Sequence, residues 1–239
     1  MKFEITLSKI LNRKHYVSAK KNARNLPDDF TVTFHAGAMK TKPNSIESIK
    51  AALDYGAKVV EFDVSFRPDG TAVIIHNGKP EDDEGVLLED ALAVVATDKE
   101  CKINLDIKST ANLPEVDKLV KKFGLSERVF YTGVFEDWVE TVKNTSAIPY
   151  YLNHNLSKKE SYDENLLQEL ADKIISLGAI GLNSNFSNAS AVSTRAMRKN
   201  GLLVSLWTAN KAADMARVIA CRPDNVTTKN PHILLEMLR

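Results

Sequence analysis

The stretch VVEFDVSFRPDGTAVIIHN, residues 59–77, contains two carboxylates and a histidine within nineteen residues. Its first part, residues 59–65, is rich in β-branched residues and is predicted to form a strand. Glu61 and Asp63 then share one face, because side chains alternate along a strand. Asp69-Gly70 lies between two β-prone segments and predicts a hairpin turn. The chain is therefore expected to fold back on itself shortly after the two carboxylates.

The register of this hairpin decides where His76 points. If residues 69–70 alone form the loop, His76 lies opposite Asp63 on the same face of the sheet. A three-residue loop, 68–70, would place His76 opposite Phe62 on the other face, because a slip of one residue reverses every side chain. We favour the two-residue loop, which brings the imidazole to the carboxylates and predicts a cation with an adjacent acid or base. A strand whose charges simply face water is the alternative, but the apolar residues between the carboxylates favour burial.

Length and composition limit the class of protein. With 239 residues and 44% hydrophobic content, the chain can bury one full core, and its length matches a single α/β barrel. The 32 basic and 31 acidic side chains nearly cancel, so we expect neither a nucleic-acid partner nor a stable membrane anchor. Two cysteines, Cys101 and Cys221, are too few for a disulfide scaffold. No long apolar segment or signal peptide is apparent, so we expect a soluble, cytoplasmic protein with unknown oligomeric partners.

Strands and helices are predicted to alternate after an N-terminal cap of one or two helices in residues 1–28. The expected strands are 31–35, 59–65, 103–108, 128–133, 148–153, 179–183, 202–208 and 225–229. The expected helices are 46–56, 87–96, 115–124, 135–144, 164–178, 189–201, 210–220 and one at the end of the chain. With the hairpin arm 71–76 set aside, eight strands remain, because a parallel strand needs a longer connection than a turn. This alternation predicts a single-domain (β/α)₈ TIM barrel over residues 1–239. A doubly wound sheet is the alternative, but the sequence lacks a GxGxxG motif.

Polar residues gather at or near the predicted carboxyl ends of the strands, where barrels of this class have their catalytic groups. They are His35, Glu61, Asp63, Asp106, Lys108, Asn183 and Trp207. The three carboxylates offer oxygen ligands without cysteine, which favours a divalent cation such as Mg²⁺ or Ca²⁺. A cation with a fixed lysine charge suits a phosphate ester, and the two histidines could supply a base and an acid.

Seven segments resemble the glycerophosphodiester phosphodiesterase family in order and approximate spacing. They are FHAG (34–37), PNSIESIKAALDYGA, VVEFDV, RPDGTAVIIHN, NLDIK, LWTAN and TTKNP, and the resemblance covers residues 31–231. It implies a TIM barrel that uses a divalent cation to hydrolyse glycerophosphodiesters to sn-glycerol 3-phosphate and an alcohol.

The resemblance also implies roles for individual residues. The implied catalytic pair is His35, assigned here as the base, and His76, assigned as the acid. The implied metal ligands are Glu61, Asp63 and Asp106. The expected substrate-binding residues are Lys108 near the phosphate, Trp207 as a wall of the pocket, Asn44, Tyr151 and Asn183.

Several positions depart from the family pattern. Ala36 stands where the family usually has Arg, Pro43 where it has Glu, and Asp106 where the third metal ligand is ordinarily Glu. Asn77 replaces a common Asp, and the segment after it is too short for the extra substrate-capping region of many members. Two alternatives stay open: a sphingomyelinase D-like phospholipase that releases a cyclic phosphate, and a barrel that binds a phosphorylated ligand without turnover.

Overall fold

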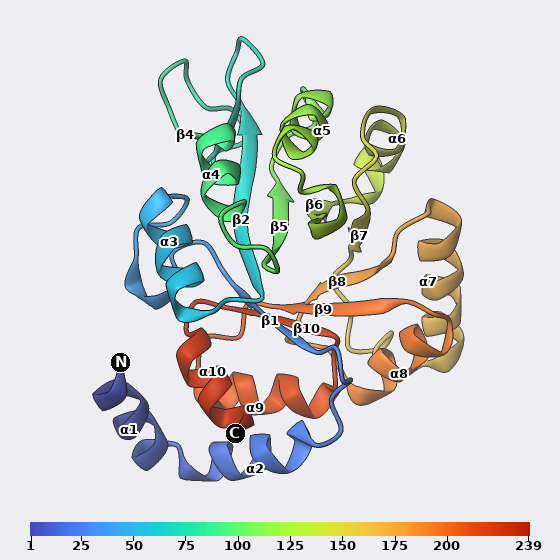
Figure 1. Cartoon of the computed structure of the whole chain (residues 1–239). Helices are drawn as coiled ribbons and strands as arrows, with labels where there is room; N and C mark the ends of the chain where they lie inside the picture. Colours follow the sequence, from blue (N-terminus) through green and yellow to red (C-terminus); the bar gives the residue numbers. More distant parts are fainter. The chain divides into compact units, whose positions relative to one another are not determined.

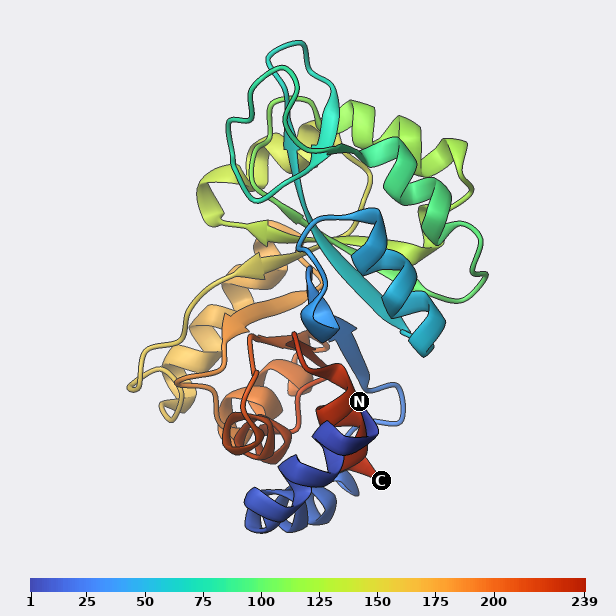
Figure 2. The same cartoon turned by 90° about the vertical axis from the view of Figure 1, so that its left-hand side faces the viewer.

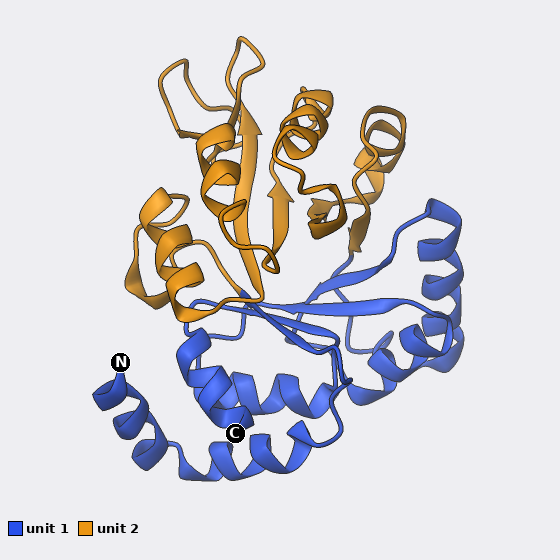
Figure 3. Ribbon diagram, viewed as in Figure 1, with its two compact units in different colours: residues 1–33, 154–239 blue, residues 34–153 orange.

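The computed structural model describes all 239 residues, which divide into two compact units. Unit 1 contains residues 1–33 and 154–239, and unit 2 contains residues 34–153 (Figure 3). All the predicted strands and helices are present, and their ends lie within two residues of the expected ones. The expectation of a single domain stays a prediction.

Unit 2 is built on a sheet with the strand order β7-β6-β5-β2-β3-β4 (Figure 1). Its parallel strands are β2 (Val59–Phe66), β5 (Lys102–Ile107), β6 (Val129–Val134) and β7 (Tyr150–Asn153). The hairpin arm β3 (Ala72–Ile74) is antiparallel to β2, and it pairs in turn with β4 (Val86–Leu87), a two-residue strand that the sequence did not predict. The helices are α3 (Ile46–Tyr55), α4 (Leu88–Val95), α5 (Leu113–Lys122) and α6 (Glu136–Thr145), with short 3₁₀ turns η1 (Ala38–Lys40) and η2 (Ser126–Arg128).

Local sequence signals explain the helix ends in unit 2. The hydroxyl of Ser45 caps α3 by accepting a hydrogen bond from the Ser48 N–H at 3.1 Å. Gly56 ends the same helix with φ 87°, a conformation in which a side chain is unfavourable. Successive helices pack against one another in the order α3-α4-α5-α6. Strand β2 is buried along its whole length, and its apolar face includes Phe62 and Val64, so Glu61 and Asp63 are held on a rigid element.

The predicted register of the hairpin is wrong. Val64 pairs with Ile74 and Phe66 with Ala72, which corresponds to a three-residue loop, 68–70. The Asp69 carboxylate accepts a hydrogen bond from the Thr71 N–H at 2.9 Å, and this local bond favours the longer turn over the two-residue one.

The strands of unit 1 follow the order β1-β10-β9-β8. Its strands are β1 (Thr31–Phe34, whose last residue begins unit 2), β8 (Gly181–Asn185), β9 (Leu203–Trp207) and β10 (Asn225–Thr228). Its helices are α7 (Glu164–Leu177), α8 (Ala191–Lys199), α9 (Ala212–Cys221), α10 (Pro231–Leu238) and the N-terminal pair α1 (Lys2–Leu11) and α2 (Arg13–Ala23). Helix α2 packs on α9 and α10, and α1 packs on α10 and α2 (Figure 2). None of the helices is long and apolar enough to span a bilayer.

Candidate active site

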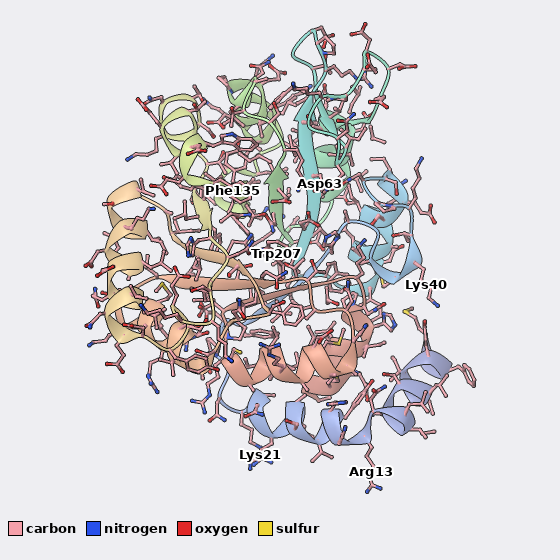
Figure 4. All side chains as sticks on the ribbon, turned by 180° about the vertical axis from the view of Figure 1, so that it is seen from behind. Arg13, Lys21, Lys40, Asp63, Phe135 and Trp207 are labelled. Atoms are coloured by element: carbon pink, nitrogen blue, oxygen red, sulfur yellow. The ribbon has the colours of Figure 1, made fainter.

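Three carboxylates in unit 2 converge on one point. Strands β2 and β5 are parallel neighbours, and their register pairs Asp63 with Asp106 (Asp63 is labelled in Figure 4). One oxygen from each of Glu61, Asp63 and Asp106 lies within 4.8 Å of the other two. Glu61 and Asp63 are buried, and Asp106 is partly exposed. An all-oxygen set of this spacing fits a hard divalent cation, because such ions take carboxylate ligands.

Lys108 supplies the positive charge of this cluster. Its Nζ lies 3.0 Å from Asp63 Oδ1 and also donates to Asp106 Oδ2. Burial opposes the charge of the ammonium, but the neighbouring carboxylates Asp106 and Asp63 raise the pKa of Lys108 above its ordinary value. The lysine is therefore cationic throughout the physiological pH range.

The two buried carboxylates of β2 have opposite ionisation behaviour. Burial, together with the charges of Asp63 and Asp106, raises the pKa of Glu61 well above its ordinary value. Burial also disfavours the ionised form of Asp63, but Lys108 and the amide of Asn44 overcome this effect and lower the pKa of Asp63. Without a cation, the site therefore favours the ionised form of Asp63 and disfavours that of Glu61.

His35 directly follows β1 and lies at one side of the carboxylates. Its Nδ1 is 2.9 Å from the carbonyl oxygen of Ala36 and 3.6 Å from Glu61 Oε2. A carbonyl oxygen only accepts hydrogen bonds, so this contact requires Nδ1 to carry the proton. In the neutral ring, Nε2 then holds the lone pair. The Ala36 N–H also donates to Glu61 Oε2 at 2.8 Å, so the backbone after β1 joins the histidine to the carboxylate cluster.

His76 lies beside Asp63 even though the hairpin register differs from the predicted one. If β3 continued in the observed register, His76 would lie opposite Phe62. However, β3 ends at Ile74, so side chains no longer alternate between the two faces of the sheet beyond that residue. After the Ile75 N–H donates to the carbonyl of Asp63 at 3.1 Å, the chain turns, and His76 Nδ1 lies 3.2 Å from Asp63 Oδ2. The expected proximity of His76 to Asp63 is thus confirmed, but it arises because the strand ends before His76, and not from the predicted register.

Asn44 holds Asp63 with both ends of its amide. Its Nδ2 donates to Asp63 Oδ2 at 2.7 Å, and its Oδ1 accepts a hydrogen bond from the Asp63 N–H at 3.0 Å. The backbone of Asn44 has φ 52°, a left-handed conformation that asparagine tolerates better than most residues. Asn44 is therefore a residue that orients the central carboxylate.

Two residues beside Asp106 were not predicted from the sequence: Thr132, which hydrogen-bonds it, and Gly133, which leaves room for it. The register of β5 and β6 pairs Asp106 with Thr132, whose hydroxyl donates to Asp106 Oδ1 at 2.9 Å. Gly133 follows with φ 78°, and a Cβ at this position would lie 2.8 Å from the same carboxylate oxygen. The only sign of this in the sequence is a threonine followed by a glycine at the end of a predicted strand. That these residues contact Asp106 depends on the register between β5 and β6, which the sequence does not reveal.

The remaining predicted substrate residues lie on strands β7, β8 and β9. Tyr151, on β7, is buried and packs edge-on against Phe130 with ring centroids 5.5 Å apart. Asn183 lies on β8, where its carbonyl accepts a hydrogen bond from the His154 N–H at 3.1 Å, and Trp207 is the last residue of β9. Asn183 and Trp207 belong to unit 1, and the substrate-binding roles of all three residues stay predictions.

A family model for the glycerophosphoryl diester phosphodiesterases matches residues 35–81 and 77–233, which include every residue of the cluster described above. The chain belongs to the glycerophosphoryl diester phosphodiesterase family. As a member of this family it is a phosphoric diester hydrolase, as its sequence predicted. The family model extends over both compact units.

Individual relatives agree with this assignment. A glycerophosphodiester phosphodiesterase from Caldanaerobacter subterraneus subsp. tengcongensis is 24% identical over 245 residues, covering 87% of this chain and 97% of the relative. A solved structure assigned to the same family, from Silicibacter pomeroyi, has a TM-score of 0.74 at 20% identity and covers 92% of this chain and 97% of its own. An Oleispira antarctica phosphodiesterase in complex with the product sn-glycerol-3-phosphate has a TM-score of 0.70 at 18% identity, covering 91% of this chain and 98% of its own. These likenesses confirm the predicted (β/α)₈ barrel fold.

Proposed function

We propose that this glycerophosphodiester phosphodiesterase hydrolyses its substrate to sn-glycerol 3-phosphate and an alcohol, with His35 as base and His76 as acid. The observation that carries the proposal is the arrangement of two imidazoles around the carboxylates: His35 next to Glu61 and His76 next to Asp63. The product is inferred from the Oleispira antarctica relative, which was solved with sn-glycerol-3-phosphate.

The hydrogen bonds of the two rings support different roles. The Nδ1–H of His35 donates to a neutral carbonyl oxygen, so its Nε2 is available to accept a proton. The Nδ1–H of His76 donates to the Asp63 carboxylate, whose charge stabilises an imidazolium that can give up a proton from Nε2. The side chain of His76 is 81% exposed, which suits protonation of an alcohol that leaves into water.

The proposed reaction is a displacement at phosphorus. A water molecule gives a proton to His35 Nε2 as its oxygen forms a bond to phosphorus. The bond between phosphorus and the alcohol oxygen breaks, and His76 Nε2 gives that oxygen a proton. The ammonium of Lys108 can stabilise the negative charge that develops on the phosphoryl oxygens.

A divalent cation fits the donor set of Glu61, Asp63 and Asp106, and we propose Mg²⁺ or Ca²⁺ as the cofactor. When bound, it would neutralise charge on the phosphate and polarise the phosphorus–oxygen bonds. Asp106 is shorter than the family's usual Glu, and the Thr132 hydroxyl and Lys108 both hold it in the cluster. We also propose a cytoplasmic location, because both cysteines are free thiols, as in a reducing compartment.

The test is an assay on glycerophosphocholine for the native chain, H35A, H76A and the control H15A, which removes a histidine on α2. We expect EDTA to abolish turnover in the native chain and both active-site variants to lose roughly two to four orders of magnitude in kcat, with H15A unchanged. Turnover that survives both H35A and H76A would eliminate the proposed acid and base. Release of a cyclic phosphate would favour the sphingomyelinase D-like alternative, and tight binding without turnover in the native chain would favour the non-catalytic one.

A further inference from the structure

Helix α1 has an apolar face that points into solvent. Phe3, Leu7, Ile10 and Leu11 follow the spacing of one helical stripe, and none of the ten residues of the helix is buried. The exposed fractions are 81% for Phe3, 71% for Ile10 and 72% for Leu11. An amphipathic helix on the surface of a protein normally turns such a stripe toward the core. In α1 the apolar stripe faces outward.

The opposite face of α1 is held to unit 1 by polar contacts. Glu4 Oε2 lies 3.7 Å from His232 Nε2 on α10, and Lys9 pairs with Glu236 on the same helix. The Nδ2 of Asn12 donates to the carbonyl of Ser8 at 3.1 Å. Glu4 and Lys9 thus connect α1 to α10 through charged side chains, and the apolar stripe is left available.

Helix α2 continues this surface with positive charge. Tyr16 and Ala19 are buried on the side of α2 that packs against α9 and α10. The other side contains Val17, which is exposed, surrounded by basic residues. These are Arg13, Lys14, Lys20, Lys21 and Arg24, all exposed. In Figure 4, Arg13 and Lys21 extend away from α9.

The near-neutral charge of the whole chain conceals a strong local imbalance. The first 27 residues contain seven basic side chains and one acidic one, whereas the remaining 212 contain 25 basic and 30 acidic. The positive charge is thus concentrated on the two helices that also carry the exposed apolar stripe. A basic surface beside Phe, Ile and Leu side chains is the combination by which helices lie in the interface of an anionic bilayer.

We propose that α1 and α2 form a docking face for membranes that contain anionic phospholipids. In this face the stripe of Phe3, Leu7, Ile10 and Leu11 enters the boundary between headgroups and acyl chains, and the basic residues of α2 contact lipid phosphates. A nucleic acid would use the basic residues but would leave the apolar stripe in water. A second copy of the chain would bring two basic helices together in a two-fold interface, and their like charges would repel. The inference concerns unit 1 and is independent of the proposed catalytic residues, which lie in unit 2.

The test is co-sedimentation of the full chain with vesicles of phosphatidylcholine alone, or of three parts phosphatidylcholine to one part phosphatidylglycerol. We expect binding to the anionic vesicles, weakened by salt, and little binding to the neutral ones. K20E/K21E/R24E should lose at least about a hundredfold in affinity, since each basic residue near the surface contributes about fivefold. F3S/I10S/L11S should lose at least about tenfold, because its apolar side chains no longer leave water.

Matched controls come from other surfaces of unit 1. I175S removes an exposed apolar side chain of α7, and K158E/K159E reverses two exposed charges; both should bind like the native chain. Thermal unfolding should be unchanged in all variants, because the replaced side chains are exposed. The proposal is overturned if the native chain ignores anionic vesicles at low salt, or if either triple variant binds as tightly as the native chain. It is equally overturned if sedimentation reveals a dimer that F3S/I10S/L11S separates, since the stripe would then face a second copy.

Discussion

Glu61 is a buried carboxyl group whose ionisation the fold disfavours. Its pKa is raised by burial and by two neighbouring carboxylates, so keeping it charged near neutral pH destabilises the cation-free protein. The pKa of Glu61 in the folded protein is higher than its value of about 4.3 in the unfolded chain. The protein therefore loses stability as pH rises from the unfolded pKa to the folded one.

E61Q should therefore raise the melting temperature in EDTA at pH 8 by roughly 2–4 °C, equivalent to about 1 kcal/mol in a protein of this size. At pH 5 the difference should be smaller, and with saturating cation its sign should reverse, because the variant loses a ligand. The melting temperatures of the native chain and E61Q, measured in EDTA at pH 8, at pH 5 and with saturating cation, test these expectations. A variant that is less stable in EDTA at pH 8 would contradict the raised pKa.

Cation binding should release protons. Glu61 must ionise to act as a ligand, so the dissociation constant for Mg²⁺ should rise as pH falls through its raised pKa. Calorimetric titration in buffers with different ionisation enthalpies measures the number of protons released. An observed binding enthalpy that is the same in every buffer would show that Glu61 is already ionised in the free protein.

Asn44 should affect catalysis by orienting Asp63. N44G keeps the left-handed backbone but removes both hydrogen bonds to Asp63. We expect kcat/KM to fall about tenfold or more, which corresponds to losing roughly 1.4 kcal/mol of transition-state stabilisation, together with weaker cation binding. N44D, which adds a charge beside Asp63, should be worse than N44G. Unchanged kinetics in N44G would leave Asn44 with a purely structural role.

At the scale of elements, the end of β6 must approach β5 closely for the cluster to form. A Cβ on Gly133 would lie 2.4 Å from the carbonyl oxygen of Ile107, a distance that the backbone cannot accommodate without moving. G133A should therefore lower the free energy of unfolding by roughly 2–4 kcal/mol and weaken cation binding through Asp106. The control is G201A, which has a similar φ of 74° but no atom within 4 Å of the added Cβ.

Denaturant unfolding separates the two effects. G201A should lose only the roughly 1 kcal/mol that a left-handed backbone costs an alanine, and its cation affinity should not change. If G133A and G201A lost equal amounts of unfolding free energy and of cation affinity, the close approach of β6 to β5 would not be a requirement of the site.

The sequence predicted the elements of this fold better than the contacts between them. Helix α3 was predictable because Ser45 and Gly56 mark its ends, and β2 because its β-branched residues alternate with carboxylates. The hairpin register was not, since Asp69-Gly70 is compatible with two loop lengths and the hydrogen bond from Thr71 to Asp69 decides between them. The contribution of Thr132 was missed for a similar reason: strand-to-strand register is a property of the sheet.

At the scale of the whole molecule, the family assignment rests on a match that extends from His35 to beyond the last strand. The local departures at Ala36 and Pro43 do not prevent assembly of the carboxylate cluster, because Glu61 receives the backbone N–H of Ala36 and Asp63 receives the amide of Asn44. The three carboxylates and Lys108 therefore still lie together. The net charge of +1 did not reveal the basic surface of α1 and α2, because the excess of acidic residues in the rest of the chain nearly cancels their positive charge.

In the proposed reaction water attacks phosphorus, and ³¹P NMR of glycerophosphocholine hydrolysis in ¹⁸O-labelled water can detect this attack. We expect the label to enter sn-glycerol 3-phosphate, shifting its ³¹P signal, and the released choline to contain none. A labelled choline would mean cleavage of the carbon–oxygen bond, and an unlabelled cyclic phosphate as the end product would mean attack by the substrate's own hydroxyl. Either result would contradict the proposed roles of His35 and His76.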